Sequence, residues 1–296
     1  MLSVSVVVPV HNGADALPEL LAALASQEGV GDVEVVVVDN ASTDTTAEVA
    51  GASPVVTRVV HEPQPGSYVA RNAGWRTTSG EVVAFTDADC VPSPGWLAGL
   101  LGALAEGELA AGAVVPGPPP AGRWAAWWAA YDRAMYLDQK ENVERDGFAA
   151  TANLAVRRQV LEELDGFDDA LVSGGDFAFT RAATSAGHRL VWAPAAPVLH
   201  RPRAALRSTW SLWRRLGRGY GDLAAQGSWP RALRHDPVLR APLAQVTARA
   251  RSRGVSTATP VLALAHTVAR LAVLRGRLDR PGTWSINVPA GPPGAP

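Results

Sequence analysis

The sequence has little cysteine and no long apolar run, and both absences narrow what the protein can be. Cys90 is the only cysteine among 296 residues, so the chain can form neither an internal disulfide framework nor a zinc site built from several cysteines. A reducing compartment, the cytoplasm, is therefore expected. No stretch reaches the about eighteen consecutive apolar residues of a membrane-spanning helix, and the start of the chain lacks a basic leader. We expect a protein that is soluble or peripheral at the inner face of a membrane.

Two common phosphate-binding motifs are also missing. The first apolar segment is followed by the residues HNGADAL rather than by a G-x-G-x-x-G turn, and the chain contains no G-x-x-x-x-G-K-[ST] loop. The sequence therefore favours neither a dinucleotide site of the Rossmann type nor a P-loop for a triphosphate. Any bound phosphate must be held in another way.

Charge is distributed very unevenly along the chain. Residues 1–200 contain 11 Lys and Arg against 25 Asp and Glu, whereas residues 201–296 contain 16 against 3. The two parts thus carry −14 and +13, although the whole chain carries only −1. This opposition favours docking of the two parts on each other and leaves open an anionic partner for the basic part. We expect no nucleic-acid partner.

Strand-like and helix-like segments alternate in the first third of the chain. Their Val-rich runs are unbroken, which is typical of a parallel sheet covered by helices on both faces. The sequence therefore predicts an α/β fold. Strands are expected at 3–10, 33–39, 54–60, 81–87 and 188–194, and helices at 14–26, 43–51, 67–78, from 176 and at 206–224. Trp124, Trp127, Trp128 and Tyr131 stand at helical spacing and are interpreted as core residues.

Polar side chains stand where the predicted strands end, which is where open α/β sheets collect their ligands. His11 and Asn12, Asp39 and Asn40, and the pair Asp87 and Asp89 all occupy such positions. Two aspartates at i and i+2 are costly to keep ionised unless something compensates their charge. They also supply the oxygen ligands that Mg²⁺ or Mn²⁺ prefers. By itself this D-x-D pattern is a weak signal, because such pairs are frequent in solvated loops.

The order of several motifs makes the pattern more specific. In chain order they are VVVPVHNGADALPELLAALASQ, VEVVVVDNASTDTTAEVA, PGSYVARNAGWRTTSGEVVAFTDADCVPSPGWL, ATANLAVRR and SGGDFAFTRAATSAGHRLVWAP. This series covers about residues 3–225 and resembles the family 2 glycosyltransferases. The resemblance implies the GT-A fold, with a mostly parallel, Rossmann-like sheet. It also implies transfer of a sugar from a UDP, dTDP or GDP donor to an acceptor hydroxyl, with Mn²⁺ or Mg²⁺ as cofactor.

The resemblance implies that the nucleotide lies over the ends of the first strands. Pro9, Val10 and His11 would lie along the base. Asp39 would accept a ring N–H, which suits uracil, thymine or guanine. Arg71 would lie near the nucleotide and the first aspartate of the pair; the alternative is an ordinary surface arginine on a helix.

The same resemblance separates the roles of the two aspartates. Asp87 would lie near both the ribose and Arg71, and it would also border the metal site. Asp89 would be the principal metal ligand. His200 corresponds to a histidine that completes the metal shell in some relatives. A lone histidine is also commonly structural, and that alternative stays open.

The resemblance assigns the catalytic base to Asp176, which would take the proton from the attacking hydroxyl. Its place at the start of a helix is expected to favour the ionised form, and helix capping is the simpler alternative. Gly175 departs from the family pattern, in which glutamate is common, and this puts the hydrogen bonding around the acceptor in question. Asn153 is expected beside the donor sugar or the acceptor.

The chain is expected to divide into a glycosyltransferase domain at 1–226, a basic helical extension at 227–284 and a disordered Pro/Gly-rich tail at 285–296. The extension could pack on the domain, pair with another subunit or lie on an anionic membrane. Packing is the favoured interpretation. One helical face of the extension is predicted to contain Val261, Leu264, Val268, Leu271 and Leu278.

Several functional alternatives remain open at this stage. The aromatic and basic helix at 206–224 resembles one that covers the diphosphate in some relatives. Because it lacks the full Q-x-x-R-W pattern of processive synthases, we expect transfer of single sugars. The resemblance to the family implies inversion. The acceptor could be a lipid-linked glycan or polysaccharide of the cell envelope, a metabolite or a protein. A retaining enzyme, a sugar nucleotidyltransferase and a non-catalytic sugar-nucleotide-binding or assembly module are the alternatives.

Overall fold

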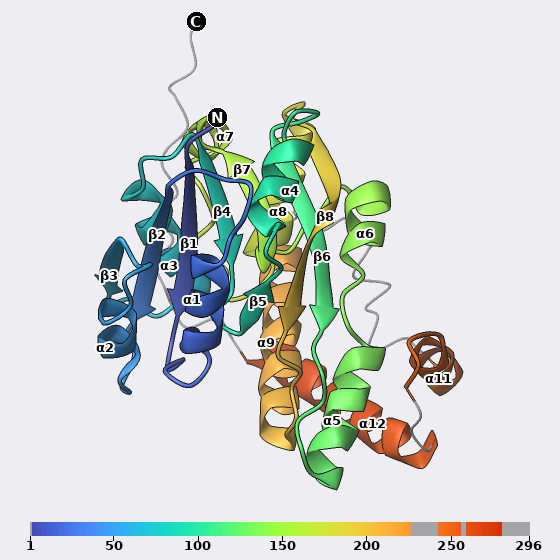
Figure 1. The fold of residues 1–296 in the computed structure, drawn as a ribbon. Coiled ribbons are helices and arrows are strands. Elements are labelled where there is room, and N and C mark those ends of the chain that lie inside the picture. The colour runs from blue at the N-terminus through green and yellow to red at the C-terminus, as the bar shows by residue number, and fades with distance from the viewer. Residues whose placement is uncertain (1, 226–241, 256–258, 280–296) are drawn as a thin grey trace, which may run out of the picture.

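The computed structural model describes residues 2–225, 242–255 and 259–279, and a mixed eight-stranded sheet forms its centre (Figure 1). The strand order is β3-β2-β1-β4-β7-β6-β8-β5. The pairs β1–β2, β1–β4, β2–β3 and β6–β8 are parallel, and the other three are antiparallel. The strands are β1 (Val4–Val10), β2 (Val33–Asn40), β3 (Arg58–Glu62), β4 (Val82–Thr86), β5 (Cys90–Pro92), β6 (Leu109–Pro116), β7 (Asn153–Arg157) and β8 (Leu190–His200).

Helices cover both faces of this sheet, as the unbroken valine runs predict. Every residue of β1 is buried, because its alternate side chains enter two different hydrophobic cores. On one face lie α1 (Leu17–Ala25), α2 (Thr46–Gly51) and α4 (Trp96–Ala103). On the other lie α3 (Ser67–Arg76), α7 (Arg158–Glu163) and α8 (Gly175–Ser185). The α/β architecture expected from the sequence is confirmed.

Some elements differ from their expected bounds because tertiary contacts define them. β8 continues to His200, well beyond the expected end at 194, since its second half pairs with β5 and β6. The short strand β5 itself, α6 (Gln139–Glu141) and a π-helical turn η1 (Asn142–Asp146) carry no periodic pattern that would announce them. The pairing of β5 with β8 brings together segments that are far apart in the sequence.

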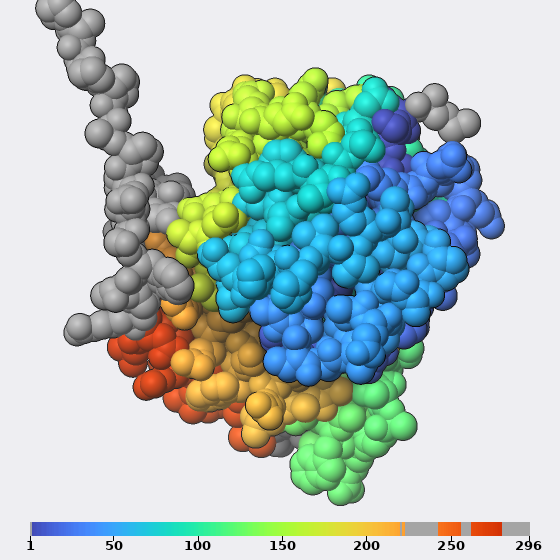
Figure 2. Space-filling view, turned by 90° about the vertical axis from the view of Figure 1, so that its left-hand side faces the viewer, coloured from blue at the N-terminus to red at the C-terminus, as the bar shows by residue number. Residues whose placement is uncertain are grey.

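A layer of helices lies at the end of the sheet toward which β6 points (Figure 1). It consists of α5 (Arg123–Ala134), α9 (Leu206–Ala225), α11 (Leu243–Ser252) and α12 (Thr259–Leu278), which share a third hydrophobic core. Figure 2 shows α9 and α12, in orange and red, packed beneath the α/β part. Tyr131 is fully buried in this core, and its hydroxyl lies 3.1 Å from Nδ1 of His266. Trp124, however, is 64% exposed, so the core interpretation is wrong for that residue.

The buried face of α12 is not the leucine face predicted from the sequence. Leu264, Leu271 and Leu278 are exposed, whereas small residues such as Ala265, Ala269 and Ala272 face the core. The reason is a close crossing with α9: a Cβ atom added to Gly276 would lie 2.0 Å from the carbonyl oxygen of Arg214, and one added to Gly217 would lie 2.3 Å from that of Val273. Two helices can approach so closely only where both present small side chains.

The C-terminal extension packs against the rest of the chain, as the favoured interpretation expected. The expected boundary at 226/227 and the Pro/Gly-rich tail at 285–296 lie outside the described residues. In the described ranges, no helix combines the length and the apolar content needed to cross a bilayer.

Candidate functional site

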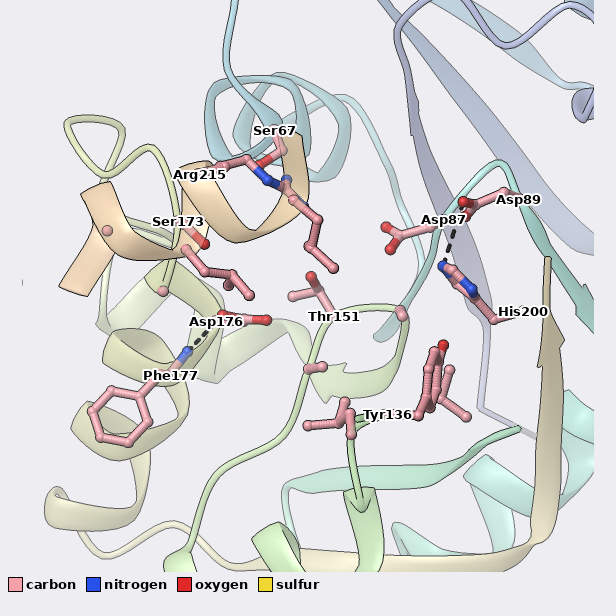
Figure 3. Close-up of a pocket in the computed structure, with 18 of the residues that line it drawn as sticks. Ser67, Asp87, Asp89, Tyr136, Thr151, Ser173, Asp176, Phe177, His200 and Arg215 are labelled. Atoms are coloured by element: carbon pink, nitrogen blue, oxygen red, sulfur yellow. Dashed lines mark hydrogen bonds and ion pairs between the residues drawn. The ribbon is translucent and has the colours of Figure 1, made fainter. Parts of the chain in front are cut away.

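A large cleft of about 1910 Å³ lies at the carboxyl ends of β1 and β4 and is bounded by α8 and α9 (Figure 3). Most of the residues singled out from the sequence line it, although they come from five separate segments of the chain. Asp39, Asn153 and Gly175 are not among the lining residues. The cleft is lined by Pro9, Val10, His11, Arg71, Asp87, Asp89, Asp176 and His200.

The end of β1 forms one wall of the cleft. The His11 ring is held by a hydrogen bond between Nδ1 and the carbonyl oxygen of Asn40, at 2.7 Å. Asp39 is buried beside this wall and is already engaged: Oδ1 accepts from the N–H of Ser42, and Oδ2 lies 3.1 Å from Nδ1 of His61. Each carboxylate oxygen has a further lone pair, so Asp39 can still accept one more N–H.

Arg71 compensates the charge of the first aspartate. Its Nη2 donates to Oδ1 of Asp87 at 2.6 Å, and its Nη1 donates to the carbonyl oxygen of Ser67 at 3.1 Å. The Arg71 side chain is only 6% exposed, whereas that of Asp87 is 33% exposed. The surface-arginine alternative is thereby excluded. Asp87 keeps its remaining acceptor sites toward the cleft.

The second aspartate has a different partner. Cys90 pairs with His200 across β5 and β8, and this register brings the imidazole beside Asp89, with Nε2 3.4 Å from Oδ2. The buried Nδ1 of His200 has no hydrogen-bond partner in the described part of the chain. A carboxylate and an imidazole fit a divalent ion such as Mn²⁺. No group of three His, Cys, Asp or Glu side chains arranged for a metal occurs among the described residues, so two protein ligands would leave positions for phosphate oxygens and water.

Asp176 begins α8 on the opposite side of the cleft from Asp87, Asp89 and His200 (Figure 3). Its Oδ1 accepts two hydrogen bonds, from the N–H of Phe177 at 2.9 Å and from the hydroxyl of Tyr68 at 3.2 Å. Burial raises the pKa of this carboxyl, although the charge of Arg71 and both hydrogen bonds oppose that shift. The start of the helix favours the ionised form, as expected, through the N–H of Phe177, but burial outweighs this contribution to the pKa. A carboxyl with a raised pKa is a better proton acceptor near neutral pH.

Asn153 has a structural role instead of the expected contact with sugar. Its side chain is fully buried: Oδ1 accepts from Trp96 Nε1 at 2.8 Å, and Nδ2 donates to the carbonyl oxygens of Ala113 and Ala196 at 2.9 and 2.7 Å. These bonds tie β7 to β6, β8 and α4. Asn153 uses both of its amide N–H groups inside the fold and does not line the cleft, so it is not placed to contact a ligand there.

Thr151, two residues before Asn153, lines the cleft, whereas the sequence predicts Asn153 there. Its hydroxyl stands between Asp176 and Asp87 in Figure 3, and no hydrogen bond to it occurs within the described residues. Tyr136 lines the same region, with its ring 5.5 Å from that of His200. Neither residue could be selected from the sequence, because Thr151 lies in the turn before β7 and Tyr136 in the segment after α5, and no pattern says which side chain of such a segment points inward.

Helix α9 closes the cleft above the start of α8. A Cβ atom added to Gly219 would lie 2.5 Å from the carbonyl oxygen of Ser173, so the helix backbone rests directly on the loop that leads to Asp176. Arg215 and Trp213 of this helix line the cleft. Arg214 instead forms an ion pair with Asp279 at 2.6 Å.

Comparison with solved structures places this fold among the glycosyltransferases. A mannosyltransferase from Pyrobaculum calidifontis, solved with GDP-Man and Mn²⁺, matches with a TM-score of 0.61 and 23% identity, over 94% of this chain and 88% of that one. TarS of Staphylococcus aureus, solved with UDP, matches with a TM-score of 0.54 and 18% identity, over 93% and 90% of the two chains. The GT-A fold expected from the sequence is confirmed.

Sequence comparison gives the family. AglE of Haloferax volcanii is 38% identical over 196 residues, which is 64% of each chain. The pre-mycofactocin glycosyltransferase of Mycobacterium tuberculosis is 31% identical over 251 residues, 81% of this chain and 49% of that protein, so the chain spans only part of these relatives. The family model of glycosyl transferase family 2 matches residues 5–165, more than half of the chain. This chain belongs to glycosyl transferase family 2.

Proposed function

We propose that the chain catalyses metal-dependent transfer of one sugar from a nucleotide-diphosphate sugar to an acceptor hydroxyl, with inversion at the anomeric carbon. The observation that carries this proposal is the arrangement of the cleft. Asp176 stands on one side, while Asp87, Asp89 and His200 stand on the other. An in-line displacement at the anomeric carbon needs the base and the leaving group on opposite faces of the sugar.

The reaction can be written from these positions. The acceptor hydroxyl gives its proton to Asp176 while its oxygen forms a bond to the anomeric carbon. The bond from that carbon to the diphosphate oxygen breaks, and the nucleoside diphosphate leaves with the electron pair. Asp176 accepts the proton because burial raises the pKa of its carboxyl. Thr151, between the two sides, is placed to bind a hydroxyl of the sugar.

Asp89 and His200 would hold the divalent metal, which when bound neutralises the charge that develops on the departing diphosphate. Asp87 would contribute less to the metal, because Arg71 already occupies one of its oxygens. Instead, Asp87 and Arg71 orient the nucleoside side of the donor. Arg215 of α9 adds a positive charge to the lining of the cleft.

The identity of the donor is tested by thermal shift. The complexes of the structural neighbours contain GDP-Man or UDP, and the carboxylate of Asp39 suits bases with a ring N–H. We expect one of UDP-GlcNAc, GDP-mannose or a dTDP-sugar to raise the melting temperature with Mn²⁺ present. At about a hundred times its Kd, a ligand stabilises the folded state by about 2.7 kcal/mol.

The same screen without Mn²⁺ and with EDTA is the control. A donor that binds through the metal raises the melting temperature only when Mn²⁺ is present. If no nucleotide sugar and no nucleoside diphosphate produces a shift with Mn²⁺ or Mg²⁺, the proposed function is refuted. A shift with donor but no release of nucleotide on long incubation would favour a non-catalytic binding module.

The exposed side of α12 supports an acceptor carried on a membrane. Leu264, Leu271 and Leu278 are exposed, and Arg275 and Arg277 stand in the last turn. We expect the chain to float with vesicles that contain phosphatidylglycerol, and the triple change of these leucines to serine to lower the bound fraction several-fold. Leu199→Ser, at an exposed leucine of β8, is the matched control. Equal flotation of the triple variant would contradict membrane contact through α12.

A further inference from the structure

The start of α8 touches α3 through one aromatic side chain, Tyr68. Its hydroxyl donates to Oδ1 of Asp176 at 3.2 Å, across 108 positions of the sequence. Its ring lies flat against the residue before Asp176: a Cβ atom added to Gly175 would be 2.8 Å from two ring carbons and 2.9 Å from a third. Tyr68 therefore contacts both the carboxylate and the backbone that carries it.

The Tyr68 ring is fixed on several sides. It is 5% exposed, it stacks on Phe167 with ring centroids 5.9 Å apart, and the guanidinium of Arg71 lies 5.6 Å from its centroid. Burial raises the pKa of Tyr68, so its hydroxyl stays protonated and acts as a donor. A donor with so little freedom defines the position of its acceptor closely.

Gly175 is the residue that makes this contact possible. Any side chain at this position would require the Tyr68 ring or the first turn of α8 to move, because the ring already occupies the space of a Cβ atom. This explains physically why the chain departs from the glutamate that the sequence pattern led us to expect at position 175. The position normally used for a side chain is filled by an aromatic ring from α3.

We propose that Tyr68 is the positioning residue of the catalytic base: resting on Gly175, it holds Oδ1 of Asp176 so that Oδ2 faces the acceptor hydroxyl. Oδ2 accepts no hydrogen bond from the described residues, whereas Oδ1 accepts two. This inference rests on the proposed function and adds a residue that no motif contains. The other charged groups facing Asp176 are Arg71 on α3, Asp87 after β4 and Arg215 on α9.

The test is Tyr68→Phe, which removes only the hydroxyl and keeps the ring against Gly175. A hydroxyl donor stabilises the carboxylate, so its loss raises the pKa of Asp176 further. Because the base must be ionised, the acidic limb of the kcat profile should move to higher pH by about one pH unit. At pH values on the acidic limb, kcat of Tyr68→Phe should be about tenfold below the native value, and it should recover at higher pH. KM for the donor should stay unchanged.

Two further variants separate positioning from packing. Tyr131→Phe removes a buried hydroxyl in the helical layer, far from Asp176, and should leave the pH profile in place. Gly175→Ala should lower kcat strongly in the native background but add little in a Tyr68→Ala background, where the ring is gone. An unmoved acidic limb in Tyr68→Phe, or a kcat lowered equally at every pH, would overturn the proposal.

A direct measurement distinguishes failure of this inference from failure of the proposed function. The pKa of Asp176 can be followed by ¹³C carboxyl chemical shifts, with Asp176→Asn as the assignment control, and this readout needs no turnover. If the chain releases no nucleotide from UDP-GlcNAc or GDP-mannose but the pKa still rises in Tyr68→Phe, only the function is refuted. If the chain turns over and that pKa does not move, only the role of Tyr68 is refuted.

Discussion

Replacing Asp176 by asparagine should lower the rate of sugar transfer by about 10²- to 10⁴-fold, while donor affinity stays within a few-fold of the native value. Asparagine preserves the size of the side chain and can still accept from Tyr68 and Phe177 through its oxygen, but it cannot take a proton. The loss should therefore appear in kcat. Release of nucleoside diphosphate in the presence of Mn²⁺ measures it, and the thermal shift by the donor measures binding.

Asp15→Asn is the matched control for this change, because Asp15 lines the same cleft and carries an exposed carboxylate paired with Arg201 at 3.2 Å. It removes an equal charge without touching the base, and its rate should stay near the native rate. If Asp176→Asn retained most of the native kcat, Asp176 could not be the base and the direct displacement would have to be abandoned.

Alanine substitutions of Asp87 and Asp89, the two aspartates after β4, should have opposite effects on stability and on ligand binding. Asp87→Ala leaves the buried Arg71 without its carboxylate partner, so the free energy of unfolding should fall by about 1.5–3 kcal/mol. Asp89 is 41% exposed, so Asp89→Ala should unfold at nearly the native denaturant concentration. It should, however, lose the stabilisation that Mn²⁺ and donor give together. Urea unfolding with and without these ligands measures both effects.

A double variant checks the reason given for Asp87. If the cost arises from an unpaired arginine, Arg71→Met combined with Asp87→Ala should be more stable than Asp87→Ala alone, since no buried charge remains. Equal stability of the two would mean that the ion pair contributes little. Retained Mn²⁺-dependent donor binding in Asp89→Ala would remove Asp89 as the principal ligand.

The parts of the fold that follow from local pattern could be predicted from the sequence. The valine runs of β1, β2 and β4 can be buried on both faces only in a covered parallel sheet, and their ends must then meet at one edge. This reasoning places His11 and Asp87 at a common edge of the sheet. The resemblance carried by the motif order extends the site to Arg71, Asp176 and His200, which no local pattern would connect.

The remaining features depend on distances that a sequence does not contain. Which residue of the 151–153 turn faces the cleft depends on side-chain direction, and so Asn153 was expected where Thr151 stands. The buried face of α12 depends on how closely α9 approaches, which favours alanine over leucine. The pKa of Asp176 depends on the balance between burial, which raises it, and nearby hydrogen-bond donors, which lower it. A predicted helix start indicates the backbone donors but not the burial.

The glycines of α9 also make one wall of the cleft mechanically stiff. Gly219 seats the helix on the loop before Asp176, and Gly217 seats its opposite side on the backbone of α12. At both glycines the backbone of α9 is in direct contact with the backbone of its neighbour, with no flexible side chain between them. A substrate that presses against this wall would have to displace two helices together. Residues of the short α6 and of the π-helical turn η1 also line the cleft, and these elements are only three and five residues long.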